Sequence, residues 1–154
     1  MSFKSFTLQN IYWEDVCIDA LTLKGEKNLC TKFVVKGGAA KVPRDIIIRH
    51  NSVGSLYINS FYAQNSQRLY VSCPNWNSGY QERSDVTKTD DVVASNVKFL
   101  AAVKKNYRDI VTLKNSKITG GTGYRMYTRN NNGGDPKAFG NQYETSNIYS
   151  CTWS

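Results

Sequence analysis

The stretch from Asp45 to His50 reads DIIIRH, and its run of isoleucines between charged residues is typical of a buried β-strand. Two further stretches have the same character, DALTLK at Asp19–Lys24 and QRLYVS at Gln67–Ser72. These stretches therefore recur at intervals of roughly 22 to 26 residues. A repeat of that length, built from strand units, predicts the stacked coils of a β-solenoid.

The rest of the chain is also rich in short β-branched and aromatic segments bounded by Gly, Asn or Ser, and almost nothing in it has a helical pattern. These segments are FVVKGG from Phe33, SLYINSFY from Ser55, DVVASNVKFL from Asp91 and DIVTLKNSKITG from Asp109. An ordinary β-sandwich also has strands at short spacing and is the alternative. The solenoid is favoured by Asn10, Asn59, Asn96 and Asn115, which each follow a strand and tolerate left-handed corners. We therefore expect an all-β solenoid.

Length and composition set the broad class. The chain has 154 residues, enough for one domain spanning residues 1–154 with its own core. It has no run of 18 apolar residues, so no membrane contact is expected. The opening segment MSFKSFTLQN lacks the features of a secretory signal, so either the mature chain is given or the protein is not exported by that route.

The formal net charge of +8 favours polyanionic partners through long-range attraction. The positive residues are spread along the chain and no nucleic-acid motif accompanies them, so nucleic acid is not the expected partner. A merely basic surface without a polyanionic partner is the other interpretation.

The cysteines are Cys17, Cys30, Cys73 and Cys151, with no CxxC spacing, and His50 is the single histidine. This pattern argues against structural zinc. It is compatible with two disulfides in an oxidising compartment, for which three pairings exist.

Several longer stretches resemble, in order and spacing, the small secreted pectate lyases of polysaccharide lyase family 3. They are NIYWEDVCIDALTLKG, GGAAKVPRDIIIRHN, INSFYAQNSQRLYVSC, AAVKKNYRDIVTLKNSKITG and YTRNNNGGDP. The resemblance runs from about Thr7 to about Pro136. It implies a right-handed, single-stranded parallel β-helix, a secreted protein of the plant cell wall environment, and calcium-dependent β-elimination on polygalacturonate.

That reaction removes a weakly acidic proton from C5 of a uronate, so it requires a cation on the neighbouring carboxylate and a base near C5. Calcium would supply the cation through carboxylate ligands. The resemblance gives these ligand positions to Asp15 and Asp19, whereas the acid that precedes Asp19 in the family is Ile18 here. Without the resemblance, Asp15 and Asp19 are equally well explained as residues that cap turns or pair with Lys24.

The catalytic positions are also only partly kept. The resemblance places cations of the site at Lys24 and Arg68, but it places the catalytic lysine at Ile46 and the candidate base arginine at Val71. Gln64 and Asn65 stand where the family usually carries acids, and Asp45 matches the Asp before the catalytic lysine.

We therefore expect a site that has lost part of its chemistry. The candidate catalytic residues are Arg68, Lys24 and Arg44, where Arg44 is included because on a strand it would share a face with Ile46. The candidate substrate-binding residues are Lys24, Lys41 and Arg68, and the candidate metal residues are Asp15 and Asp19.

Three functions remain open from the sequence. The first is a catalytically impaired pectate-lyase-like protein, or pseudoenzyme, that binds acidic polysaccharide. The second is an active lyase with a relocated base at Arg44 or Arg68, and the third is a β-helix module for a protein or nucleic-acid partner. Because the family's earlier coils would precede Met1, self-association through an exposed coil end is also expected.

Overall fold

The computed structural model describes residues 4–24, 31–41, 44–52, 54–72, 86–104, 109–128 and 137–142. All regular elements in this part of the chain are strands, and none is a helix. Their bounds are β1 Lys4–Glu14, β2 Asp19–Lys24, β3 Thr31–Lys41, β4 Ile46–Asn51, β5 Gly54–Ser72, β6 Val86–Lys104, β7 Ile110–Lys114, β8 Lys117–Thr119, β9 Thr122–Thr128 and β10 Lys137–Gln142.

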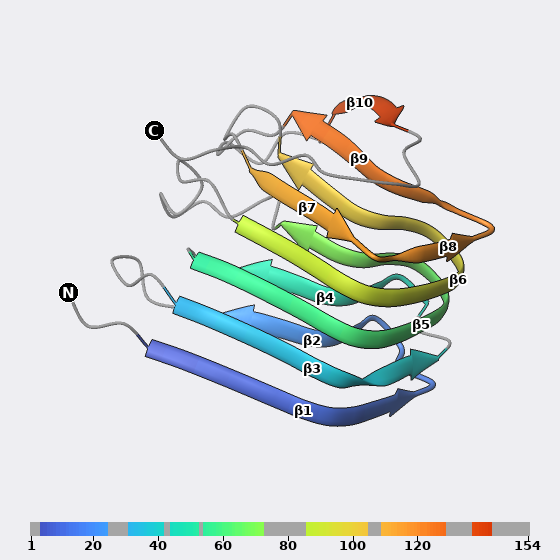
Figure 1. The fold of residues 1–154 in the computed structure, drawn as a ribbon. Coiled ribbons are helices and arrows are strands. Elements are labelled where there is room, and N and C mark those ends of the chain that lie inside the picture. The colour runs from blue at the N-terminus through green and yellow to red at the C-terminus, as the bar shows by residue number, and fades with distance from the viewer. Residues whose placement is uncertain are drawn as a thin grey trace.

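The strands stack in parallel as successive coils of a solenoid, which Figure 1 shows from the side. The first part of each coil forms two sides of the solenoid that meet at a bend, and it is built in the order β1, β3, the first half of β5 and the first half of β6, followed by β7 before the bend and β8 after it. The remaining side is built from β2, β4, the second halves of β5 and β6, and β9. We call these the first sheet and the second sheet. Parallel pairing between coils confirms the predicted β-solenoid over the sandwich, whose strands would be antiparallel.

The last described strand changes direction. β10 pairs antiparallel with β9, from Lys137 opposite Thr128 to Gln142 opposite Tyr124. The parallel stacking therefore ends at β9 within the described residues.

Each coil bends at a residue with positive φ, and these residues line up from coil to coil. The first line consists of Asn10, Gly37, Ser60, Asp91 and Asn115. The second line marks the corner between the two sheets and contains Asn65, Asn96 and Gly120. Left-handed backbone favours Gly, Asn and Asp, so the composition of these lines follows from sterics.

The expectation for corner asparagines is therefore confirmed for Asn10, Asn96 and Asn115 and wrong for Asn59. The bend falls on the next residue, Ser60, with φ of 52°. The side chain of Asn59 instead donates to the backbone oxygen of Asp90 in the next coil, at 3.4 Å.

The core lies between the two sheets and follows the period-two alternation of the strands. Inward positions such as Phe33, Leu56 and Ile58 are buried, whereas the outward positions between them are at least partly exposed. Trp13 packs against this core, and its ring centroid lies 6.1 Å from that of Phe61. Trp13 is therefore a packing residue.

Two smaller points complete the fold. No described helix could cross a membrane. Cys17 is a free and exposed cysteine, so the expectation of two disulfides, which needs all four cysteines, is not met at Cys17; Cys30, Cys73 and Cys151 lie outside the described residues.

Candidate functional site

The residues that the resemblance assigns to the site meet along the start of the second sheet. Asp19 on β2 is the register partner of Ile46 on β4, and Ile46 is in turn the register partner of Arg68 on β5. Parallel pairing thus places three positions of the expected site side by side in successive coils. This arrangement is a direct consequence of the solenoid repeat.

Asp19 is held by an arginine that the sequence analysis did not consider. The Nε atom of Arg49 donates to Asp19 Oδ2 at 2.5 Å, and its Nη2 atom donates to Asp19 Oδ1 at 3.1 Å. The pair is bidentate and largely shielded, with 24% of the Arg49 side chain and 16% of the Asp19 side chain exposed. A guanidinium therefore occupies both oxygens of the carboxylate that the resemblance gives to calcium.

A second ion pair joins Asp45 and Arg68. Arg68 Nη1 donates to Asp45 Oδ1 at 2.9 Å, and the backbone nitrogens of Gln67 and Arg68 both donate to the Asp45 carbonyl. Both side chains keep substantial exposure to solvent. Arg68 is thus a cation of the site whose charge is already balanced by a neighbour.

The positions where the family's charges are missing fall into two environments. Ile46 and Val71 are each only 2% exposed and form one apolar cluster with Ala102 and Tyr127. Ile18, by contrast, is 64% exposed. A lysine or arginine at position 46 or 71 would have to lose most of its hydration, whereas an acid at position 18 would not.

The donor set does not fit calcium in this arrangement. Asp15 is exposed at a bend, where its backbone nitrogen donates to the Lys41 carbonyl at 3.2 Å. Across the described ranges, no three His, Cys, Asp or Glu side chains gather in a way that could hold a metal ion. With Ile18 in place of an acid and Asp19 bound to Arg49, the oxygen ligands that calcium prefers are too few.

Lys24 and Lys41 lie outside that row. Lys24 is at the far end of β2, five residues from Asp19, which corresponds to about 16 Å along a strand. Lys41 lies at the end of β3 on the first sheet, beside Glu14 and Gln64 in register. The structure therefore does not bring Lys24 and Lys41 together with Arg68.

Arg44 lies in a bend before β4, not on a strand, so the expectation that it shares a strand face with Ile46 is wrong. The bend forms because Arg44 and Ile46 pair through their backbone nitrogens with the carbonyls of Val16 and Ile18 in the preceding coil. The Arg44 side chain is exposed at the corner between the two sheets.

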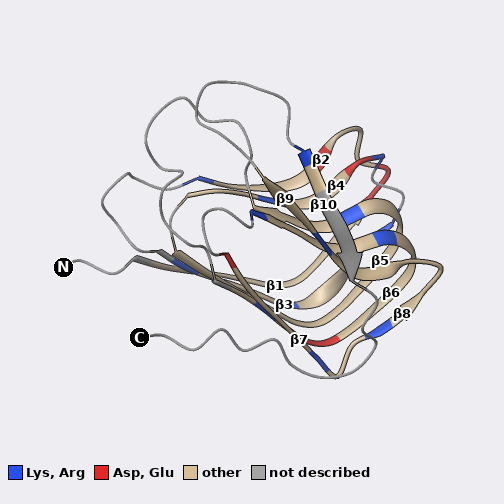
Figure 2. Cartoon of the chain, turned by 90° about the horizontal axis from the view of Figure 1, so that it is seen from above, with Lys and Arg blue, Asp and Glu red and all other residues tan. Residues whose placement is uncertain are grey.

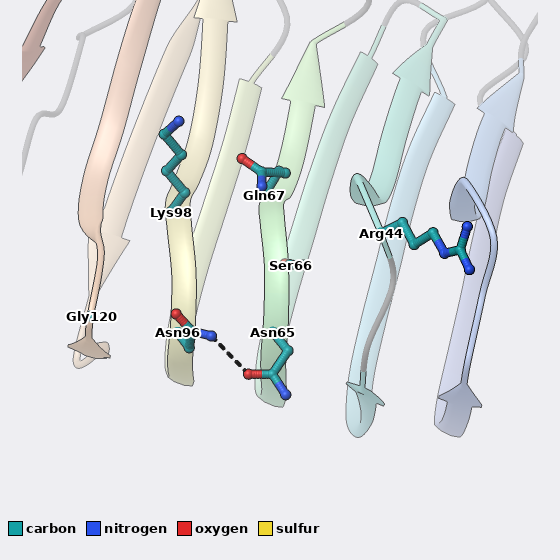
Figure 3. Close-up of a pocket in the computed structure, with 7 residues that line it drawn as sticks. All are labelled: Arg44, Asn65, Ser66, Gln67, Asn96, Lys98 and Gly120. Atoms are coloured by element: carbon teal, nitrogen blue, oxygen red, sulfur yellow. Dashed lines mark hydrogen bonds between the residues drawn. The ribbon is translucent and has the colours of Figure 1, made fainter.

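This corner carries a shallow polar pocket of about 350 Å³, shown in Figure 3. Its lining combines two cations with amides and small residues: Arg44, Lys98, Asn65, Asn96, Gln67, Ser66 and Gly120. Asn96 Nδ2 donates to Asn65 Oδ1 at 2.9 Å, which fixes both amides along the line of left-handed residues. We call this the corner pocket. Lys98 and the amide donors suit a carboxylate or a sugar hydroxyl, whereas Figure 3 shows the Arg44 guanidinium pointing away from the other lining side chains.

His50 is a structural residue. It is fully buried, its Nδ1 atom lies 3.1 Å from the Tyr70 hydroxyl, and its ring meets Phe33 edge-on at 5.4 Å between centroids. Burial lowers the pKa of His50 from 6.5 to about 4, so the imidazole is neutral at pH 7. Its position inside the core, away from the outward row of Asp19 and Arg68, excludes it from the candidate site.

Sequence reasoning missed Arg49, Lys98 and Asn96 as members of the site. Arg49 could have been found from the alternation of β4, because it stands one position before the buried His50 and therefore faces outward. Lys98 and Asn96 follow Ser66 by some thirty positions in the chain. The pairing of β6 with β5 brings them to the corner pocket. No local motif carries that signal.

The fold places the chain in the class of parallel β-solenoid proteins. Comparison with known families identifies the family within that class. The family model described as Pectate lyase matches residues 2–133. The chain therefore belongs to the pectate lyase family.

Three fungal relatives agree with this assignment. The chain is 37% identical over 110 residues to pectate lyase E of Emericella nidulans, covering 71% of this chain and 41% of that protein. It is 38% identical over 109 residues to probable pectate lyase E of Aspergillus clavatus, with the same coverage, and 37% identical over 110 residues to probable pectate lyase D of Emericella nidulans, covering 40% of that protein. The chain thus spans about two fifths of the length of the curated relatives it matches.

Proposed function

We propose that this member of the pectate lyase family binds acidic polysaccharide of the polygalacturonate kind and does not cleave it efficiently. One observation carries the proposal. Ile46 and Val71, where the resemblance expects the catalytic lysine and the base, are both buried in one apolar cluster with Ala102 and Tyr127. Neither side chain can act as a base, and neither is open to solvent.

The ion pairs support the same conclusion about the metal. β-Elimination needs charge drawn from the uronate carboxylate before the C5 proton becomes acidic enough to remove. Asp19 is engaged by Arg49, and Ile18 offers no oxygen, so the neighbourhood of Asp15 and Asp19 is a poor calcium site. The metal cation and the base act on the same step, the removal of the C5 proton. The effects on rate of losing each one are therefore strongly non-additive.

Binding of a uronate polymer is supported by cations that remain near the corner. Arg44 and Lys98 line the corner pocket. Arg68 follows the lining residue Gln67 in the sequence. Guanidinium and ammonium groups bind carboxylates by charge-assisted hydrogen bonds, and amides such as Asn65 and Asn96 add bonds to sugar hydroxyls. An extracellular location, where such polymers occur, is part of this proposal and follows from the family resemblance.

The experiment that tests the proposal measures binding and cleavage in parallel. Binding to polygalacturonate should be detectable at low salt, should weaken steeply as salt rises, and should exceed binding to a neutral glucan. The ultraviolet absorbance of the unsaturated product should not rise, with or without calcium. Equal binding to both polymers would remove the binding claim, and a calcium-stimulated rise in absorbance would remove the claim of impairment.

An active lyase with a relocated base is the second candidate, and the position of Arg44 favours it. Arg44 is exposed at the edge of the corner pocket, and within the described residues no carboxylate forms an ion pair with it. If activity is found, Arg44→Ala should abolish it, whereas Arg68→Ala, which removes a cation already paired with Asp45, should reduce it less.

A further inference from the structure

The outer face of the first sheet carries a group of lysines that none of the preceding sections uses. Its outward positions alternate with the buried residues Phe33, Val35, Leu56 and Ile58. We define the lysine face by its five outward residues on β3, β5, β6 and β7: Lys32, Lys36, Tyr57, Lys88 and Lys114. The four lysines are exposed, and Tyr57 is half-buried.

Tyr57 stands between two of these lysines. The Nζ atom of Lys32 lies 5.2 Å from the centroid of the Tyr57 ring, and the Nζ atom of Lys88 lies 5.5 Å from it. Both distances are within the range of a cation–π interaction. The aromatic ring therefore holds two ammonium groups close to the same point on the surface, although like charges repel.

The lysine face has four lysines, and the column that holds Lys36 and Lys114 also holds an acid, Asp90. The ion pairs that the described residues form elsewhere, Arg49 with Asp19 and Arg68 with Asp45, lie on the second sheet or at its start. Within the described ranges no carboxylate forms an ion pair with any lysine of the lysine face. Asp90, the acid in register with Lys114, accepts a hydrogen bond from Asn115 at 2.8 Å instead.

The lysines also follow the direction of the solenoid axis. Lys36 and Lys114 fall in one register column across β3, β5, β6 and β7, and Tyr57 and Lys88 fall in the column beside it. Neighbouring coils are about 4.8 Å apart, and the lysines of the face fall on the coils of β3, β6 and β7, with Asn59 and Asp90 between Lys36 and Lys114 in their column. Figure 2 shows Lys and Arg on the strands of both sheets, seen from above.

We propose that the lysine face is a second binding surface, separate from the corner pocket, for a linear polysaccharide that carries a carboxylate on each sugar. The class of ligand rests on the proposed function, whereas the surface does not. Such a polymer, lying along the solenoid axis, would place carboxylates against Lys32, Lys88 and Lys114, with the Tyr57 hydroxyl able to donate between Lys32 and Lys88.

A single-stranded nucleic acid fits the lysine face less well. Sequence-tolerant binding of single strands uses aromatic side chains on which bases stack. Tyr57 is the aromatic member of the lysine face, and ammonium groups already lie against its ring. The face offers cations without an open stacking platform, which favours the polysaccharide.

The test compares two variants that each remove two positive charges. The first is Lys32→Gln with Lys88→Gln on the lysine face. The matched control is Lys117→Gln with Lys137→Gln, two exposed lysines outside the lysine face, on β8 and β10. Binding to polygalacturonate fragments and to single-stranded oligothymidylate is measured at low salt, with circular dichroism to check the fold.

We expect the dissociation constant for polygalacturonate to rise about tenfold in the lysine-face variant, because two exposed ionic contacts are lost, and about twofold or less in the control. Oligothymidylate should bind more weakly than polygalacturonate. If the unmodified protein binds polygalacturonate and the two variants lose equal affinity, the lysine face is not a binding surface. The proposed function would still stand. Absence of polygalacturonate binding by the unmodified protein would overturn the proposed function, and stronger binding to oligothymidylate through Lys32 and Lys88 would overturn the ligand class.

A second readout does not depend on variants. Saturating polygalacturonate should protect Lys32 and Lys88 from an amine-acetylating reagent, as followed by mass spectrometry, and should leave Lys117 and Lys137 reactive. Equal reactivity of all four lysines with and without the polymer would contradict the proposal.

Discussion

The outward residues of the two sheets differ in their exposure to solvent and in whether their charges are paired. On the second sheet, Ile46 and Val71 are buried in an apolar cluster, and nearby charges pair within the protein, as Asp19 does with Arg49. On the first sheet, Lys32 and Lys88 flank Tyr57 and remain exposed. The difference is that charges on the face where the family resemblance expects catalysis pair within the protein, whereas lysines on the first sheet remain exposed to solvent.

The largest expected effect comes from restoring charge on the second sheet. Ile46→Lys and Val71→Arg should each lower the free energy of unfolding by about 3 to 5 kcal/mol, because each places an unpaired cation in a nearly water-free cluster. Ile18→Glu, at an exposed position, is the control and should change it by about 0.5 kcal/mol or less. Urea denaturation measures all three. Full stability of the Ile46→Lys and Val71→Arg variants would mean that these positions are open to solvent and to substrate.

His50 should make the protein less stable in mild acid. Its pKa is lowered to about 4 in the folded protein, against 6.5 in an unfolded chain. As the pH falls, the unfolded chain binds the proton at a higher pH than the folded protein does. The stability that the neutral, buried His50 contributes is therefore fully present above pH 6.5 and is lost as the pH falls from 6.5 to 4. The loss should reach roughly 3 kcal/mol.

Urea midpoints at pH 7 and pH 4.5 measure this loss. His50→Gln should be less stable than the unmodified protein at pH 7 and should show a weaker dependence on pH across this window. An unchanged pH dependence in His50→Gln would assign the acid sensitivity to other groups.

The fold could be predicted from the sequence because it repeats. The recurrence of strands such as Asp45–His50 at coil spacing, with asparagines at corners, is a local signal that the pairing of β2, β4 and β5 confirms. The prediction was wrong where a shift of one residue determines the position of a bend. The bend expected at Asn59 lies at Ser60. A left-handed bend displaced by one position changes little in the sequence pattern.

The candidate site could be predicted only in part, for a physical reason. Matching residues to a motif identified Asp19, Ile46 and Arg68, which the register indeed places side by side. It could not predict that Arg49, one coil further along, binds Asp19, because that contact depends on side-chain geometry across 30 residues of sequence. Nor could it reveal the lysine face, whose members come from four separate strands.

The Asp19–Arg49 pair should have a smaller effect on stability. Asp19→Asn should lower the free energy of unfolding by about 1 kcal/mol, since both side chains keep some contact with solvent and the pair is partly screened. Asp19→Asn combined with Arg49→Gln should cost little more than either change alone, as a double-mutant cycle would measure. Strict additivity of the two changes would mean that the pair contributes no coupling.

The smallest expected effect concerns the lysine face. Lys32→Gln with Lys88→Gln should leave the free energy of unfolding within about 0.5 kcal/mol of the unmodified protein, or raise it slightly, because it relieves repulsion between exposed charges. Thermal or urea denaturation at low salt measures this. A clear loss of stability would indicate that the two lysines serve packing, and the contrast between the two sheets would then weaken.

The most direct test of the account is the lyase assay on the unmodified protein. Polygalacturonate is incubated with the protein in calcium and, separately, in a calcium chelator, while ultraviolet absorbance reports the unsaturated product. Pectate lyase E of Emericella nidulans serves as the comparison enzyme. The account predicts no increase in absorbance above the protein-free reaction under either condition, together with salt-sensitive binding to the same polymer. A robust increase that requires calcium would contradict it.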